Sequence, residues 1–228
     1  MPIPDIIAID GPAAAGKSTV GERVAAKLGY LYFDTGIMYR AITWAALQQG
    51  LDIADEPAIT ALAQRAHIDV IQPTVDDGRQ YTVHVDGQDV TWDLRRPEVE
   101  AHVSAVSAYP EVRTALSAQQ RRIGLRGHVV MVGRDIGTVV LPEAPLKVYL
   151  DATVEARARR RYRENRARGE KVRYAAILGA MRERDRIDSQ RKAAPLRAAD
   201  DAVVIDTTKL VVEQVVELVL RLIAERSG

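Results

Sequence analysis

A nine-residue stretch near the start of the chain constrains the possible folds more than any other feature. Residues 11–19 read Gly-Pro-Ala-Ala-Ala-Gly-Lys-Ser-Thr and fit the pattern G-x-x-x-x-G-K-[ST]. The apolar run 6–10 before it predicts a buried parallel strand, and the apolar residues that recur at helical spacing after it predict a helix. A glycine loop between a strand and a helix is the context of a phosphate-binding loop.

The residue types in this loop explain how it would hold phosphate. Gly11 and Gly16 allow the backbone to turn so that successive N–H groups point at phosphate oxygens. The following helix directs the positive end of its dipole to the same place. Lys17 would reach the outer phosphates, and Ser18 would offer its hydroxyl to Mg²⁺. The sequence therefore predicts a nucleoside triphosphate site formed by Gly11, Pro12, Ala13, Ala14, Ala15, Gly16, Lys17, Ser18 and Thr19.

Composition limits the remaining possibilities. A chain of 228 residues, 47% of them apolar, has enough material for one core with a small appended subdomain. The net charge of +1 gives no overall field that would collect nucleic acid. The absence of cysteine excludes disulfides and thiolate metal sites, and the four histidines lack metal-ligand spacing. The segment Met1-Pro2-Ile3-Pro4-Asp5 has no basic region or cleavage site, and no run is long enough for a membrane span. We therefore expect a cytoplasmic enzyme.

The order of the predicted elements indicates an α/β fold. Further apolar runs predict core strands at 29–34, 127–132, 146–150 and 202–205. Helical patterns predict helices from Asp34 or Thr35 to a C-cap near Gly50, from 55 to 67, from Pro97, from Pro110, and at 210–223. The order β-α-β-α, an insert, then β-β-α-β-α predicts a parallel sheet with helices on both faces.

The insert has a different pattern from the rest of the chain. Short strands are predicted at 68–71, 81–85 and 90–92, separated by the turn signals Asp77-Gly78 and Asp86-Gly87. They form a small antiparallel sheet on the substrate side. Tyr81 and Trp92 are expected in the core of this sheet rather than stacked on a ligand.

Charged side chains outside the loop indicate a second phosphate site. Arg40 lies in the first turns of a helix that follows a strand, and Gly133-Arg134-Asp135 follows another strand. Ligands bind parallel sheets at this edge. Arg184, Asp188 and Arg191 are spaced i, i+4, i+7, so that they share one helix face and would suit a phosphate and a ribose diol. They belong to the charge-dense stretch 153–191, which is either a solvated helical pair or a lid that closes over ATP.

Together these motifs resemble a known family. The loop, Asp34-Thr35-Gly36 with Tyr39-Arg40, Gly133-Arg134-Asp135-x-Gly-Thr138, and Arg184-Asp185 with Asp188 and Arg191 have the order and spacing of bacterial cytidylate kinases, which are nucleoside monophosphate kinases. The similarity covers essentially the whole chain, including the antiparallel insert. One difference is residues 13–15, where the family usually has another glycine or a serine. Since backbone N–H groups do the binding, we expect little loss.

The resemblance implies roles for individual residues. The loop would hold ATP with Mg²⁺, the metal at Ser18. The phosphates of acceptor and donor would be held by Arg40, Arg134, Arg184 and Arg191. Thr35 and Asp188 would contact the acceptor, Asp188 at its ribose, while Ser104, Arg113 and Asp135 would read the cytosine. The arginines of 157–163 would lie beside ATP. The residues expected to act in catalysis are Lys17, Arg134, Arg184, Asp188 and Arg191.

The resemblance also implies an activity and a domain division. The expected reaction is ATP-dependent phosphorylation of CMP and dCMP by in-line transfer in pyrimidine metabolism, in a monomer without nucleic-acid or membrane partners. Residues 1–36, 126–156 and 200–228 would form the phosphate-loop core. Residues 37–125 would bind the acceptor, with the insert at about 68–95, and 157–191 would form the lid.

Two other functions are compatible with the phosphate loop but fit the rest of the chain less well. A small-metabolite kinase of the shikimate type would share the loop, but the extra sheet and the Arg–Asp–Arg stripe would then have no purpose. A nucleotide switch or nucleic-acid translocase would require a strand that ends in Asp-Glu. Neither 130–133 nor 148–152 supplies that pair.

Overall fold

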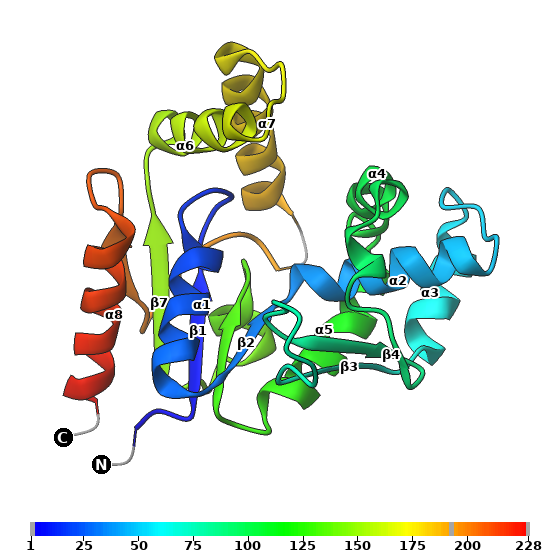
Figure 1. Cartoon of the computed structure of the whole chain (residues 1–228), viewed down its shortest axis with the longest axis horizontal. Coiled ribbons are helices and arrows are strands. Elements are labelled where there is room, and N and C mark those ends of the chain that lie inside the picture. Colours follow the sequence, from blue (N-terminus) through cyan, green and yellow to red (C-terminus); the bar gives the residue numbers. More distant parts are fainter. Residues whose placement is uncertain (1–2, 192–193, 227–228) are drawn as a thin grey trace.

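The central sheet of the protein has five parallel strands in the order β2-β6-β1-β7-β8 (Figure 1). They are β1 (Ile6–Asp10), β2 (Leu31–Asp34), β6 (Val129–Val132), β7 (Leu146–Asp151) and β8 (Val203–Asp206). The computed structural model describes residues 3–191 and 194–226. Residues 1–2 and 227–228, which belong to the predicted core domain, lie outside the described residues. The predicted parallel sheet is confirmed, with every strand within a few residues of its expected place.

Helices cover both faces of this sheet, as the strand order requires. A Cβ on Gly21 of α1 (Lys17–Leu28) would meet Val132, and a Cβ on Gly124 of α5 (Pro110–Gly124) would meet Met131. Neighbouring residues of a strand point to opposite faces, so α1 and α5 pack on opposite sides of β6. The C-terminal α8 (Val212–Glu225) packs beside α1.

The segment between β2 and β6 carries four helices and the small sheet, and Figure 1 shows it to one side of the core. Its elements are α2 (Gly36–Gln48), α3 (Glu56–Arg65), β3 (Ile68–Ile71), β4 (Thr82–Val85), β5 (Gln88–Asp89), the short η1 (Asp93–Arg95), α4 (Pro97–Val106) and α5. The small sheet is antiparallel, as predicted. Asp86 and Gly87 form its tight turn with φ of 50° and 86°, the pair of positive values typical of a two-residue hairpin.

The prediction of a strand at 90–92 is wrong. The third strand is Gln88–Asp89, and beyond it, among the described residues, only the N–H of Val90 still donates to the carbonyl oxygen of Val83. The hydroxyl of Thr91 accepts the N–H of Val83, where a ladder carbonyl would otherwise accept it, and Thr91 donates to Asp89. The alternation of buried and exposed positions therefore stops before Trp92. Trp92 is 43% exposed rather than in the sheet core, whereas Tyr81 is buried as expected.

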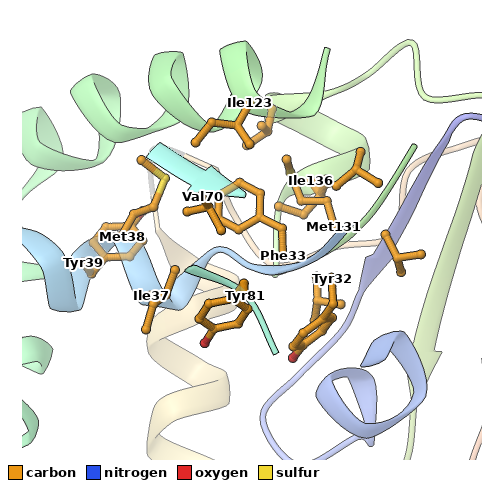
Figure 2. Packing of buried hydrophobic residues seen from close by; sticks show 14 of the residues in the cluster. Tyr32, Phe33, Ile37, Met38, Tyr39, Val70, Tyr81, Ile123, Met131 and Ile136 are labelled. Atoms are coloured by element: carbon orange, nitrogen blue, oxygen red, sulfur yellow. The ribbon is translucent and has the colours of Figure 1, made fainter. Parts of the chain in front are cut away.

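Side chains from several elements meet in one core. Phe33 of β2, Met38 of α2 and Met131 of β6 are fully buried, and Figure 2 shows them together with Tyr32, Tyr81 and Ile136. Met131 belongs to the central sheet and Tyr81 to the insert. The core thus ties the insert to the strand ends where ligands would bind.

The charge-dense stretch forms two helices, α6 (Val154–Ala167) and α7 (Tyr174–Gln190), above the loop that joins β1 to α1 (Figure 1). Helix α7 ends at Gln190, so Arg191 lies one residue beyond the helix face predicted for it. No helix in residues 3–191 or 194–226 has the length and apolar character to cross a membrane.

Candidate active site

The phosphate loop has the backbone shape that the sequence predicts. Gly11 and Gly16 have φ of 145° and 101°, which favour glycine, and a Cβ on Gly11 would lie 2.1 Å from the carbonyl oxygen of Leu150. Ala14 also has a positive φ, 59°, a conformation that costs an L-residue about 1–2 kcal/mol. The loop therefore holds backbone strain at Ala14.

The side chains of the loop gather beside the end of β2. The Nζ of Lys17 donates to the carbonyl oxygen of Pro12 at 2.8 Å, and Ser18 Oγ donates to Asp34 Oδ2 at 3.0 Å. Burial lowers the pKa of Lys17 to about 8, and the charge of Arg134 acts in the same direction. Asp34 favours the charged form. A polyphosphate would favour it further, because an anion beside an ammonium raises its pKa.

A cavity of about 640 Å³ opens on the outer side of the loop. The loop, α1, α6 and the segment before α8 line it, and positive charge comes from Arg160 and Arg161 of α6 and from Arg168 just after it. This volume is in the range of small-molecule sites. Arg160 also donates to the hydroxyl of Thr207 at 3.1 Å. Of the arginines in 157–163, Arg160 and Arg161 are therefore placed on this cavity.

A cluster of arginines and aspartates lies on the inner side of the loop. Asp188 of α7 pairs with Arg134 at 2.9 Å and with Arg191 at 3.6 Å. Arg113 of α5 pairs with Asp135 at 2.9 Å. These pairs join α5, α7 and the turn after β6, which are far apart in the sequence. Five of the predicted acceptor residues thus lie in one place.

The cluster carries more positive than negative charge. Burial lowers the pKa of Arg134, and the neighbouring charge of Arg184 lowers it further, while Asp188 opposes both. Burial likewise lowers the pKa of Arg191, with Arg113 as the next cause. Within the described residues, Arg113 Nε and Arg191 Nη2 are buried without a hydrogen-bond partner. Buried donors of this kind are costly until an acceptor reaches them, so an anionic ligand suits the cluster.

Three predicted acceptor residues, Arg40, Ser104 and Thr35, take no part in the ion pairs of this cluster. Arg40 is paired with Glu100 of α4, and the side chain of Ser104 is exposed on the same helix. Thr35 is buried and donates its hydroxyl to the carbonyl oxygen of Val132 at 3.0 Å. Among the hydrogen bonds of the described residues, none joins these side chains to Asp135 or Asp188. Their roles as ligand contacts stay predictions.

Two features of the site were missed by sequence reasoning. The first is an ion pair between α6 and α7, in which the buried guanidinium of Arg157 contacts both oxygens of Asp185. Arg157 also donates to the carbonyl oxygens of Ala152 and Ala13, so that it ties α7 to the phosphate loop. The second is Tyr39, whose ring lies 5.5 Å from the guanidinium of Arg113. The burial of Arg157 and the position of Tyr39 beside Arg113 both depend on contacts between segments that are distant in the sequence, so the sequence alone does not show them.

The oxygen atoms of Ser18 and Asp34 would suit Mg²⁺. This ion prefers oxygen ligands and keeps several waters, with few carboxylates and with phosphates as partners. Residues 3–191 and 194–226 contain no group of three or more His, Cys, Asp or Glu side chains that could hold a metal by itself. The hydroxyl of Ser18 and the carboxylate of Asp34 are therefore suitable ligands for an Mg²⁺ ion that also binds phosphate. They are too few to hold a structural metal.

Comparison with known proteins agrees with the motifs. A family model described as cytidylate kinase matches residues 7–225. A cytidylate kinase of Herpetosiphon aurantiacus is 51% identical over 98% of this chain and 96% of its own length. One from Bacillus subtilis is 47% identical over 97% of both chains.

A solved structure supports the fold alone. Shikimate kinase from Bacteroides thetaiotaomicron has a TM-score of 0.50 and 12% identity, over 96% of this chain and 97% of its own. At that identity the likeness says nothing of the substrate. The family match and the relatives, by contrast, extend over nearly the whole chain, the insert and the Arg–Asp pairs included. The chain therefore belongs to the cytidylate kinase family and is a phosphotransferase.

Proposed function

We propose that this protein transfers the γ-phosphate of ATP to CMP, and also to dCMP, with Mg²⁺ as the cofactor. The observation that carries the proposal is the cluster of Arg113, Arg134 and Arg191 with Asp135 and Asp188 beside Lys17. A second anion would be held there, next to the phosphates of the donor. The names of the relatives support CMP as that anion.

The donor would occupy the phosphate loop and the adjoining cavity. The backbone of 11–19 and Lys17 would hold its phosphates, and the cavity of about 640 Å³ would take its nucleoside. Ser18, supported by Asp34, would contribute to holding Mg²⁺, which neutralises charge on the transferring phosphoryl group when bound. The arginines of α6 would lie against the donor on the cavity side.

The acceptor would be read by three kinds of contact. Arg134, Arg184 and Arg191 would bind its phosphate, with Arg40 joining them once released from Glu100. Asp188 would accept hydrogen bonds from the ribose, for which its carboxylate is already held by two arginines. Arg113 and Asp135 would read cytosine, the first by donating and the second by accepting. Thr35 and Ser104 would complete the contacts.

Catalysis would then require positioning and charge more than proton transfer. A phosphate acceptor is already a nucleophile at neutral pH, so no general base is needed. The barrier would fall because both substrates are held in line and their negative charge is balanced by Lys17 and the arginines. Residues 157–191, as a lid, would exclude water that competes as acceptor. Residues 37–125 would carry the acceptor, and the core would carry the donor.

The proposal is tested by ADP release in a coupled assay. CMP, dCMP, UMP, AMP, shikimate and single-stranded DNA would be added in turn to enzyme, ATP and Mg²⁺. We expect rapid release with CMP and dCMP, much slower release with UMP and AMP, and background with shikimate and DNA. Release that is stimulated only by DNA, or equally by every nucleotide, would contradict the proposal. Omitting Mg²⁺ should reduce all rates to background.

A further inference from the structure

A buried carboxylate lies just before the phosphate loop without a role in the reaction described above. Asp10 is the last residue of β1 and is 5% exposed. Its Oδ1 accepts the N–H of Ile136 at 2.9 Å, and its Oδ2 accepts the N–H of Gly137 at 2.7 Å. Hydrogen bonds to a carboxylate are shorter and stronger than neutral ones. Asp10 therefore holds a segment that is 127 residues away in the sequence.

The held segment follows directly after Arg134 and Asp135. Ile136 and Gly137 begin η2 (Ile136–Val140), and the N–H of Gly133 on the other side donates to Ile9 of β1 at 3.1 Å. Both ends of the turn 133–137 are thus attached to β1. Ile136 is also fixed by its side chain, which is fully buried near Met131 (Figure 2). Arg134 and Asp135 lie between two anchors that belong to the strand of the phosphate loop.

We propose that Asp10 is a positioning residue: its carboxylate fixes the turn that presents Arg134 and Asp135, and so sets the acceptor site relative to the phosphate loop. The inference rests on the proposed function of those two residues. A misplacement of about 1 Å in such groups can cost 100-fold in rate. The side chain of Asp10 would therefore keep the acceptor site at a fixed position relative to the phosphate loop.

The surroundings of Asp10 disfavour its ionised form. Burial raises the pKa of Asp10 to about 6, although its two N–H partners lower it. Asp135 raises the pKa, Lys17 lowers it, and the phenol of Tyr149 on β7 also faces the carboxylate. Because the pKa is raised in the folded state, stability falls as pH rises from about 4 to about 6. The ionised form present at neutral pH is thus the less stable one, which is common at functional sites.

The variant Asp10→Asn tests the inference. An asparagine keeps the shape but can accept only one of the two N–H groups, and its amide N–H₂ opposes the other. We expect a folded protein in which the ratio of kcat/KM for CMP to that for UMP falls roughly tenfold or more, since a misplaced Asp135 no longer selects the base. Calorimetric titration should show weaker CMP binding and nearly unchanged ATP binding. An unchanged ratio in a folded variant would overturn the inference.

Asp151→Asn is the matched control. Asp151 ends the neighbouring strand β7 at the same sheet edge, and among the described residues its carboxylate accepts only the N–H of its neighbour Ala152. It should leave the ratio unchanged, and a similar fall in both variants would also count against the inference. If Asp10→Asn does not fold, a backbone ester at Gly137 removes the N–H that donates to Asp10 instead. This variant should lower the ratio of kcat/KM for CMP to that for UMP in the same way. If the ester leaves the ratio of kcat/KM for CMP to that for UMP unchanged, the inference is wrong. A wild-type enzyme that does not phosphorylate CMP would overturn the proposed function itself.

Discussion

At the scale of the residue, the charge of Lys17 has the most direct consequence for activity. Because the pKa of Lys17 is about 8, kcat/KM for ATP should fall as the pH rises through that value. Bound phosphates favour the charged ammonium, so kcat, which reports on the complex, should persist to higher pH. Lys17→Arg keeps its charge throughout and should lose the alkaline fall, even at lower activity. An alkaline fall that persists in Lys17→Arg would assign the titration to another group.

Asp135 and Arg113 should decide between cytosine and uracil. Cytosine offers acceptors at O2 and N3 to Arg113 and an amine at N4 to Asp135. Uracil presents an N–H at N3 and a carbonyl at O4, so each contact is mismatched at a cost of roughly 1–3 kcal/mol. Asp135→Ala should therefore lower kcat/KM for CMP far more than for UMP, while Arg134 still holds the phosphate. The same fall for both nucleotides would mean that Asp135 is structural and that the base is read elsewhere.

At the scale of the element, the contacts that hold α6 and α7 to the phosphate loop depend on Arg157 and Asp185. The guanidinium is almost fully buried, so removing its carboxylate leaves a charge without its partner. Asp185→Asn should lower the free energy of unfolding by about 2 kcal/mol and reduce kcat by at least about tenfold, since α7 carries Arg184 and Asp188. Thermal denaturation and steady-state kinetics measure the two effects.

The same two helices offer a matched control for that prediction. Glu155 of α6 and Arg182 of α7 form a pair at 2.9 Å, with side chains 43% and 61% exposed. Exposed pairs contribute about 0–1 kcal/mol, so Glu155→Gln should leave Tm and kcat nearly unchanged. Equal effects of both variants would indicate that total charge, and not the pair of Arg157 and Asp185, stabilises the packing of α6 on α7.

Elements with a local cause were predictable from the sequence, and those with a tertiary cause were not. The strand, loop and helix around Lys17 follow from apolar spacing and two glycines. The prediction of a strand at 90–92 was wrong because the hydroxyl of Thr91, and not a backbone carbonyl, accepts the N–H of Val83. This contact depends on how Val83 is placed in the fold. Arg191 was expected on the face of α7 but lies beyond its end, although it still reaches Asp188.

At the scale of the whole molecule, the fold and most of the candidate site could be predicted. The alternation of strands and helices determines the parallel sheet, and its ligand-binding edge follows from the strand direction. The links that assemble the site could not be predicted, because Asp10 with Gly137 and Arg157 with Asp185 join segments that are distant in sequence. The burial of Arg157, in a run whose other arginines are partly or fully exposed, is known only once α7 is placed.

Following the γ-phosphate of ATP to its product tests the proposed activity most directly. Enzyme, Mg²⁺, CMP and ATP labelled at the γ-phosphate would be incubated and the nucleotides separated, with Lys17→Ala as the control. We expect the label in CDP, in amounts equal to the ADP formed, and at least about 100-fold less with Lys17→Ala, which loses a charge-stabilising donor. Label released as inorganic phosphate, or an equal yield of labelled CDP from folded Lys17→Ala, would contradict the assignment of this site to phosphoryl transfer from ATP to CMP.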